Sequence, residues 1–122
     1  MRIGELARRT GVSVRSLRYY EEQGLLASRR TPGGHRDYTG DAVDRVDRIQ
    51  CLYAAGLCSD KISELLPCIL DQERGAPAPD LVDLLTVERR RIDGMMERLA
   101  ESRRILDGVI ASAGSGPRTD SA

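Results

Sequence analysis

Arginine and tyrosine side chains gather in the stretch SVRSLRYY, residues 13–20. The guanidinium groups of Arg15 and Arg18 can pair with guanine edges or with phosphates, and tyrosine hydroxyls can hydrogen-bond to phosphate oxygens. A solvated helix face is the alternative for the arginines. We predict that Tyr19 contacts nucleic acid and that Tyr20 is mainly buried, although its hydroxyl can also reach a phosphate. The chain has only four Tyr, no Phe and no Trp, so this stretch contains half of its aromatic residues.

The positive charge of the chain is concentrated near its amino terminus. The whole chain has 19 Lys and Arg against 19 Asp and Glu, a net charge of zero. Residues 1–39 contain eight Arg and four acidic residues, which gives this segment a charge of 8 − 4 = +4. Such a segment favours a phosphate backbone as its partner, while the remainder of the chain is acidic.

The elements that position these side chains are two short helices. Apolar residues at helical spacing predict a first helix over residues 3–9, which Gly11 ends. Ser13 is a candidate N-cap for a second helix, in which Val14 and Leu17 are spaced as buried positions, and Gly24 supplies the stop. Two helices separated by a tight turn predict a helix-turn-helix.

The next segments predict a hairpin and two further helices. Residues 25–38 place Pro32-Gly33-Gly34 between basic flanks, which is typical of a tight turn between two short extended pieces. Asp41 is a candidate cap for a third helix ending near Gly56, and a fourth helix should run from Ser59 to Leu66, closed by Pro67.

A long helix is predicted from about Asp80 to Ile110, roughly 45 Å at 1.5 Å per residue. Of the nine positions alternately four and three apart from Leu81 to Val109, seven are apolar. Such a seam is typical of a coiled coil, and most of it needs a second chain. Folding back within a monomer is the alternative. The dimerisation residues predicted from this seam are Leu81, Leu85, Ile92, Met95, Leu99, Leu106 and Val109.

Taken together, the segments MRIGELARRTGVSVRSLRYYEEQGLL, GGHRDYTGDAVDRV and AAGLCSDKISELL resemble the MerR family of bacterial transcriptional regulators. The resemblance covers residues 1–66. It implies an all-α fold with a small β wing: a winged helix-turn-helix over residues 1–70, a linker loop over 71–79, and an antiparallel coiled-coil dimerisation helix over 80–111. We expect residues 112–122 to be a disordered tail.

The resemblance also implies a function. Members bind a palindromic promoter as homodimers, together with RNA polymerase, and act by distorting the DNA. The residues expected to bind DNA are Ser13, Val14, Arg15, Arg18, Tyr19 and Tyr20 in the reader, and His35, Arg36 and Tyr38 in the wing.

No signal for catalysis, a cofactor or a metal site stands out. Cys68 and Cys58 are candidates for sensing, since some family members sense metals or oxidants through cysteines, but an isolated cysteine is more often a small buried hydrophobe. We expect Cys51 and Cys58 to face the core. The single histidine lies in a basic turn without a nucleophile nearby, so an enzyme is not expected. The effector stays unknown.

No apolar run reaches the ~18 residues that span a bilayer, which predicts a cytoplasmic protein without a membrane partner. Two alternatives remain at this point. The first is an effector-independent repressor, architectural dimer or coiled-coil adaptor. The second is an excisionase-like factor, which would work without residues 80–110.

Overall fold

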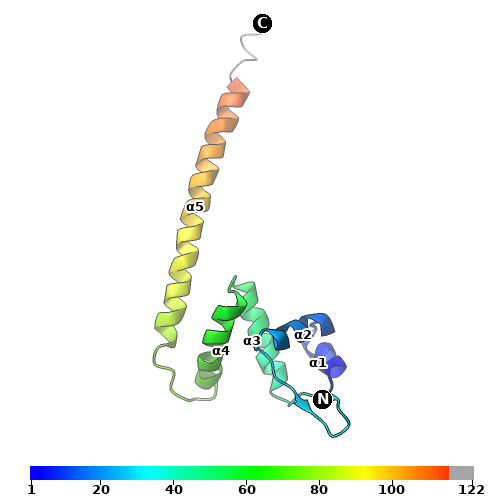
Figure 1. Ribbon diagram of the computed structural model, residues 1–122. Coiled ribbons are helices and arrows are strands. Elements are labelled where there is room, and N and C mark those ends of the chain that lie inside the picture. Colours follow the sequence, from blue (N-terminus) through cyan, green and yellow to red (C-terminus); the bar gives the residue numbers. More distant parts are fainter. Residues whose placement is uncertain (116–122) are drawn as a thin grey trace. The chain divides into compact units, whose positions relative to one another are not determined.

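The computed structural model describes residues 1–115 and divides the chain into two compact units. The first unit comprises Met1–Leu81 and the second begins at Val82. The described residues form five helices, α1 to α5, and a small hairpin that follows α2 (Figure 1). Within the described residues, none of the helices combines the length and the apolar character that crossing a membrane requires.

Two short helices open the first unit, as predicted. Helix α1 (Ile3–Thr10) ends at Gly11, whose φ of 72° lies in the left-handed region and whose N–H donates to the carbonyl of Ala7. Helix α2 (Val14–Glu22) begins after Ser13, and the Ser13 hydroxyl oxygen accepts a hydrogen bond of 3.1 Å from the N–H of Ser16. The predicted N-cap is therefore confirmed, and the turn between the helices is fixed at both ends.

The wing is a two-stranded antiparallel hairpin of strands β1 (Arg29–Arg30) and β2 (Arg36–Asp37). Its turn is closed by two backbone hydrogen bonds, from Thr31 N–H to the His35 carbonyl and from Gly34 N–H to the Thr31 carbonyl. Gly34 has a φ of 80°, which favours glycine at this position. The hairpin predicted from the Pro-Gly-Gly segment is present.

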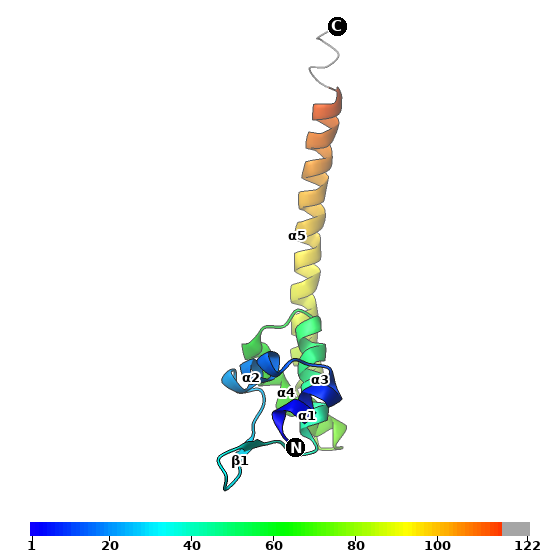
Figure 2. The same ribbon diagram turned by 90° about the vertical axis from the view of Figure 1, so that its right-hand side faces the viewer.

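Helices α3 (Ala42–Ala54) and α4 (Ser59–Glu73) complete the first unit. Helix α3 packs against both α1 and α4 and lies between them in Figure 1, whereas the three helices overlap in the turned view of Figure 2. The core is aliphatic apart from two tyrosines. Its most deeply buried side chains are Leu6, Leu17, Leu25, Tyr38, Val46, Ile49, Ile62, Leu65 and Leu66.

The predicted end of α4 at Pro67 is wrong, because the helix continues through Pro67 to Glu73. Proline removes one helical donor and disfavours helix at the preceding residue. Leu70, however, lies one turn beyond Leu66, and both side chains are buried. The burial of Leu70 in the continued helix offsets the backbone hydrogen bond that Pro67 cannot donate. The segment between α4 and α5 is therefore residues 74–80 rather than the predicted 71–79.

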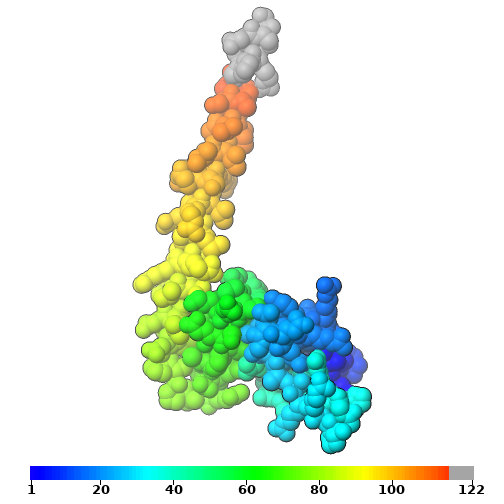
Figure 3. Space-filling view, viewed as in Figure 1, coloured from blue at the N-terminus to red at the C-terminus, as the bar shows by residue number. Residues whose placement is uncertain are grey.

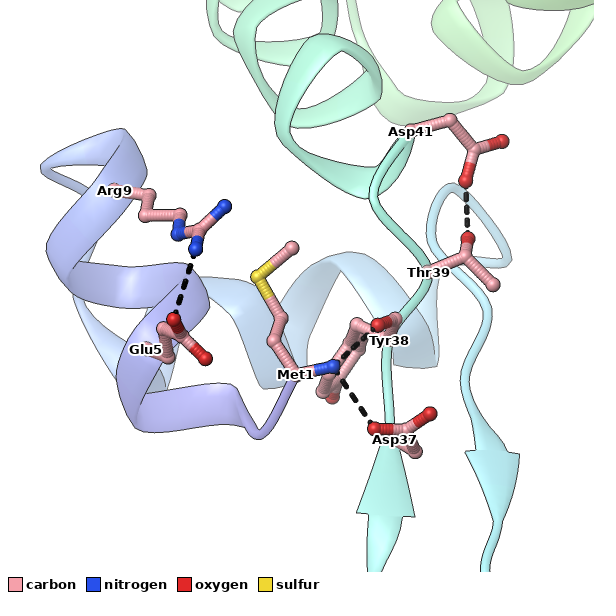
Figure 4. A network of polar contacts seen from close by, with 7 residues as sticks. All are labelled: Met1, Glu5, Arg9, Asp37, Tyr38, Thr39 and Asp41. Carbon is pink, nitrogen blue, oxygen red and sulfur yellow. Dashed lines mark hydrogen bonds and ion pairs between the residues drawn. The ribbon is translucent and has the colours of Figure 1, made fainter.

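Asp41 does not cap α3 as predicted. It has helical backbone angles, and its side chain makes no capping hydrogen bond to the helix. Its carboxylate accepts from the Thr39 hydroxyl instead (Figure 4), and this bond is the main reason that the pKa of Asp41 lies below its usual value.

Helix α5 (Leu81–Ser115) provides nearly all of the described second unit. It extends beyond the predicted end at 111, so residues 112–115 of the expected tail are helical, and 116–122 lie outside the described residues. Its large apolar side chains are mostly exposed in the single chain. They are Val82, Leu85, Val87, Met95, Met96, Leu99, Ile105, Leu106, Val109 and Ile110.

Candidate nucleic-acid interface

Helix α2 separates its side chains into a buried face and an exposed face. Leu17 and Tyr20 are buried, whereas Arg15, Arg18 and Tyr19 are exposed, with Tyr19 at 46%. This division follows the helical period, because residues three and four apart share a face. The exposed face thus carries two guanidinium groups and one phenol hydroxyl that a ligand can reach.

The two residues at the start of α2 have local roles. The Ser13 hydroxyl is exposed but caps the helix, and it also donates to the Ser16 hydroxyl at 3.0 Å. Val14 is only half-buried. Both side chains lie at the amino-terminal end of the helix that carries Arg15.

Tyr20 supports α2 from beneath. Its ring stacks on that of Tyr53 with a centroid distance of 5.6 Å, and its hydroxyl accepts a hydrogen bond from the Gln50 side chain of α3. Tyr20 is mainly buried, as predicted, with an exposed fraction of 5%. Its hydroxyl has a partner within the protein, so of the adjacent tyrosines Tyr19 is the one presented outward.

The wing presents further basic side chains. Arg29, Arg30, His35 and Arg36 are exposed, and a guanidinium N–H of Arg30 donates to the Gly34 carbonyl at 3.3 Å. Arg29 and Arg30 were not among the predicted site residues. Their position on the first strand of the hairpin, next to the turn that carries His35, was the signal available in the sequence.

Tyr38 does not lie where a phosphate could reach it, which corrects its predicted role as a DNA contact. Its side chain is 1% exposed, and its hydroxyl donates to the Glu21 carboxylate of α2. Burial, and then the hydrogen bond to Glu21, raise the pKa of Tyr38 to about 12. Tyr38 therefore belongs to the core beneath the wing.

Glu21 is a residue that sequence reasoning missed. It lies four residues after the buried Leu17, on the inner side of α2, where a charged group needs a partner. Besides Tyr38, its carboxylate accepts from the Ser28 hydroxyl at 3.3 Å and lies 3.7 Å from a guanidinium nitrogen of Arg36. An acidic residue at helical spacing from the buried Leu17 was the available signal.

The start of α1, the second half of α2 and the wing line a cleft of about 750 Å³. Figure 3 shows the wing, in cyan, beside the blue surface of the first two helices. Four arginines and two glutamates line the cleft, a net charge of 4 − 2 = +2 with histidine neutral. The lining residues are Arg2, Ile3, Arg18, Glu21, Glu22, Arg30, Gly34, His35 and Arg36.

The amino terminus of this chain is tied to the end of strand β2 (Figure 4). The Met1 ammonium donates to the Asp37 carboxylate at 2.9 Å and to the Tyr38 carbonyl at 2.7 Å. In return, the Tyr38 N–H donates to the Met1 carbonyl at 2.7 Å. The second strand of the wing is thus held beside the start of α1.

The three cysteines are free thiols within residues 1–115. Cys51 and Cys58 are exposed and Cys68 is half-buried, so the expected core positions for Cys51 and Cys58 are wrong. Cys51 lies on the outer side of α3, and Cys58 precedes the first turn of α4. No group of three His, Cys, Asp or Glu side chains able to hold a metal occurs in this part of the chain.

The predicted dimerisation residues divide into two groups. Leu85, Met95, Leu99, Leu106 and Val109 are exposed on α5, and Ile92 is half-exposed. Leu81 is different, because it is 3% exposed and belongs to the first unit. The exposed apolar seam therefore begins at Leu85 rather than at Leu81.

Comparison with known proteins gives a consistent result. The family model described as MerR HTH family regulatory protein matches residues 1–68. The nodulation protein NolA of Bradyrhizobium elkanii is 41% identical over 98 residues, which are 80% of this chain but 41% of NolA. The chain thus spans about two fifths of that relative. The mercuric resistance operon regulatory protein of Bacillus cereus is 34% identical over 86% of this chain and 79% of that protein.

Solved structures share the fold. The transcription regulator PbrR691 from Ralstonia metallidurans CH34, crystallised with lead(II), matches with a TM-score of 0.79 and 27% identity over 92% of this chain and 87% of that one. HiNmlR, a MerR family regulator bound to promoter DNA, matches with a TM-score of 0.53 and 22% identity over 93% of this chain and 86% of that one. These relatives and neighbours are regulators, not enzymes.

Proposed function

The chain belongs to the MerR family of helix-turn-helix regulatory proteins, and we propose that it binds double-stranded promoter DNA as a homodimer to regulate transcription. One observation carries the proposal: α2 exposes Arg15, Arg18 and Tyr19, and Arg18 also lines the positively charged cleft at the wing. A helix presenting arginines next to a basic hairpin suits a duplex, whose grooves and phosphates lie side by side.

In this proposal the two elements have different tasks. Helix α2 enters the major groove, where Arg15 and Arg18 pair with guanine edges or with phosphates and Tyr19 donates its hydroxyl to a phosphate. The wing follows the adjacent backbone with Arg36 and His35, and with Arg30. The arginines supply sequence-independent affinity by displacing counterions, so binding should weaken steeply as salt increases.

Dimerisation would come from α5. The seam from Leu85 to Val109 extends over about seven turns of helix. It is apolar apart from Glu88 and Ser102 and would be covered by the same seam of a second, antiparallel chain. Two reading helices held by one dimer require two half-sites, about 34–36 Å apart when both face the same side of the duplex. The proposed operator is therefore palindromic.

We propose further that the dimer acts in the cytoplasm, on a promoter that RNA polymerase also occupies, by changing the shape of the DNA between the half-sites. The resemblance to the MerR family supports this mechanism, because it implies that the DNA is distorted. The binding energy of a protein on DNA also depends in general on how easily the DNA deforms. The mercuric resistance regulator and the lead-bound PbrR691 suggest testing divalent metals as effectors first.

Footprinting tests the proposal. The full chain is applied to the DNA upstream of its own coding region and to duplexes that it selects from a random pool, with and without divalent metals and a thiol oxidant. We expect protection of a palindrome. Central hypersensitive base pairs that appear only on treatment would indicate a sensing activator, and protection unchanged by treatment would indicate an effector-independent regulator. Failure to select any duplex contradicts the proposal.

A single substitution tests the placement of the reader. Arg18→Ala should cost about 1–3 kcal/mol of specific binding, because it removes a guanidinium group that pairs with a base or a phosphate. Arg90→Ala is the matched control, because it removes the same charge from an exposed position on α5. Equal decreases in affinity for the two variants would show that net charge, rather than α2, determines the affinity.

A further inference from the structure

We propose that Glu21 is a positioning residue for DNA binding: its carboxylate holds both ends of the wing hairpin against α2. The inference rests on the proposed function and deepens it, because it names the group that sets the wing relative to the reading helix. Glu21 itself would not touch the DNA.

The contacts of Glu21 reach both sides of the hairpin. Ser28 directly precedes strand β1, and its hydroxyl donates to one carboxylate oxygen at 3.3 Å. Tyr38 directly follows strand β2, and its hydroxyl donates to the other oxygen. One side chain of α2 therefore holds the chain where it enters the wing and where it leaves it.

Arg36 adds a charged contact from within the wing. Its guanidinium lies 3.7 Å from the Glu21 carboxylate, whose side chain is only 16% exposed, while the arginine side chain is 43% exposed. The carboxylate is thus largely screened from solvent, and the guanidinium keeps an open side. This arrangement orients Arg36 in the wing and leaves donors free to approach a phosphate.

The sign of its charge makes the role of Glu21 testable. Glu21 lines the same cleft as four arginines, so a phosphate backbone lying there is repelled by its carboxylate. If electrostatics alone governed binding, removal of that negative charge would strengthen binding. If Glu21 positions the wing, its removal weakens binding although the site becomes more positive. The two explanations predict opposite changes.

Glu22 is the matched control. It is the next residue on α2, lines the same cleft and is exposed, so Glu22→Gln removes the same charge from nearly the same place. For a duplex selected by the full chain, we expect Glu21→Gln to weaken binding by about tenfold, on the order of one charge-assisted hydrogen bond. Glu22→Gln should leave binding unchanged or make it stronger.

A footprint separates wing positioning from a general loss of structure. With Glu21→Gln at saturating concentration, hydroxyl-radical protection should fade at the backbone positions that flank each half-site and persist at the backbone positions within the half-site read by α2. The slope of log affinity against log salt should also become shallower by about one for each phosphate that the wing no longer reaches. Uniform fading with an unchanged slope would overturn the proposal.

Tyr38→Phe provides a second variant in case Glu21→Gln does not fold, as judged by circular dichroism. It removes only a hydroxyl from a buried ring and should weaken binding with the same flanking pattern. In a double-mutant cycle the two changes should be less than additive, because both break the same hydrogen bond. Full additivity, or equal affinities for the Glu21 and Glu22 variants, would refute the role of Glu21. If the unmodified chain selects no duplex, the proposed function fails instead.

Discussion

Replacing Leu99 by Asp tests whether the exposed seam of α5 is a dimer interface. Leu99 is 67% exposed in the single chain. Burying a whole leucine side chain contributes about 1.5–3 kcal/mol, so covering two thirds of it contributes about 1–2 kcal/mol. Both chains of a dimer contain the residue, which gives about 2–4 kcal/mol for the pair. The dimer dissociation constant should rise about 30- to 1000-fold, and burying an unpaired carboxylate raises it further.

Sedimentation equilibrium over a range of protein concentrations measures this constant directly. Val87→Asp is the matched control, because Val87 is also an exposed aliphatic residue of α5 at 56%, but lies outside the seam. Viewed along the helix axis, the side chain of Val87 points about 120° away from that of Leu99, because an α-helix has 3.6 residues per turn. Circular dichroism should show both variants equally helical. The predicted seam is not the dimer interface if Val87→Asp weakens the dimer as much as Leu99→Asp does, or if neither substitution changes the dissociation constant.

Two further substitutions test the first unit. Ser13→Ala removes the cap of α2 and should lower the free energy of unfolding by about 1 kcal/mol, measured by urea denaturation; unchanged stability would mean that the Ser13 hydroxyl does not support the helix. Tyr38→Phe should alter the pH dependence of stability. Because burial and Glu21 raise the pKa of Tyr38 from 10.0 to about 12, folding favours its neutral form. The contribution of this pKa difference to the free energy of unfolding is complete below pH 10 and is lost as the pH rises toward 12. Between pH 9 and pH 11 the unmodified chain should lose more stability than Tyr38→Phe, and equal decreases would contradict this.

Local patterns in the sequence were sufficient to predict the elements that carry the interface. The turn at Gly11, the cap at Ser13 and the Pro-Gly-Gly hairpin depend on residues within a few positions of one another, so their physics is local. The division of α2 into an exposed and a buried face follows from its period alone. The prediction that Tyr19 is exposed and Tyr20 is buried therefore required no knowledge of other elements.

Features that depend on distant partners could not be predicted in the same way. Pro67 is a local signal to end α4, but the buried Leu70 beyond it depends on packing against the rest of the unit. Cys51 and Cys58 have the polarity of core residues, yet Cys51 lies on an exposed face of α3 and Cys58 is exposed at the cap position before α4. Tyr38 was assigned to DNA through the resemblance to the family, whereas its partner Glu21 is 17 residues away in sequence.

The tyrosines explain how a small core without Phe or Trp keeps its elements in register. Tyr20 links α2 to Gln50 of α3, and Tyr53 of α3 shares a hydrogen bond with Ser59 at the start of α4. Tyr38 links the end of the wing to Glu21 of α2. In each case the ring adds apolar contact and the hydroxyl fixes a neighbour, which phenylalanine cannot do. Aliphatic side chains supply most of the burial in this unit, while three phenol hydroxyls specify how the helices and the wing meet. Tyr19 is the exception, because its side chain is exposed on the face of α2 proposed to read DNA.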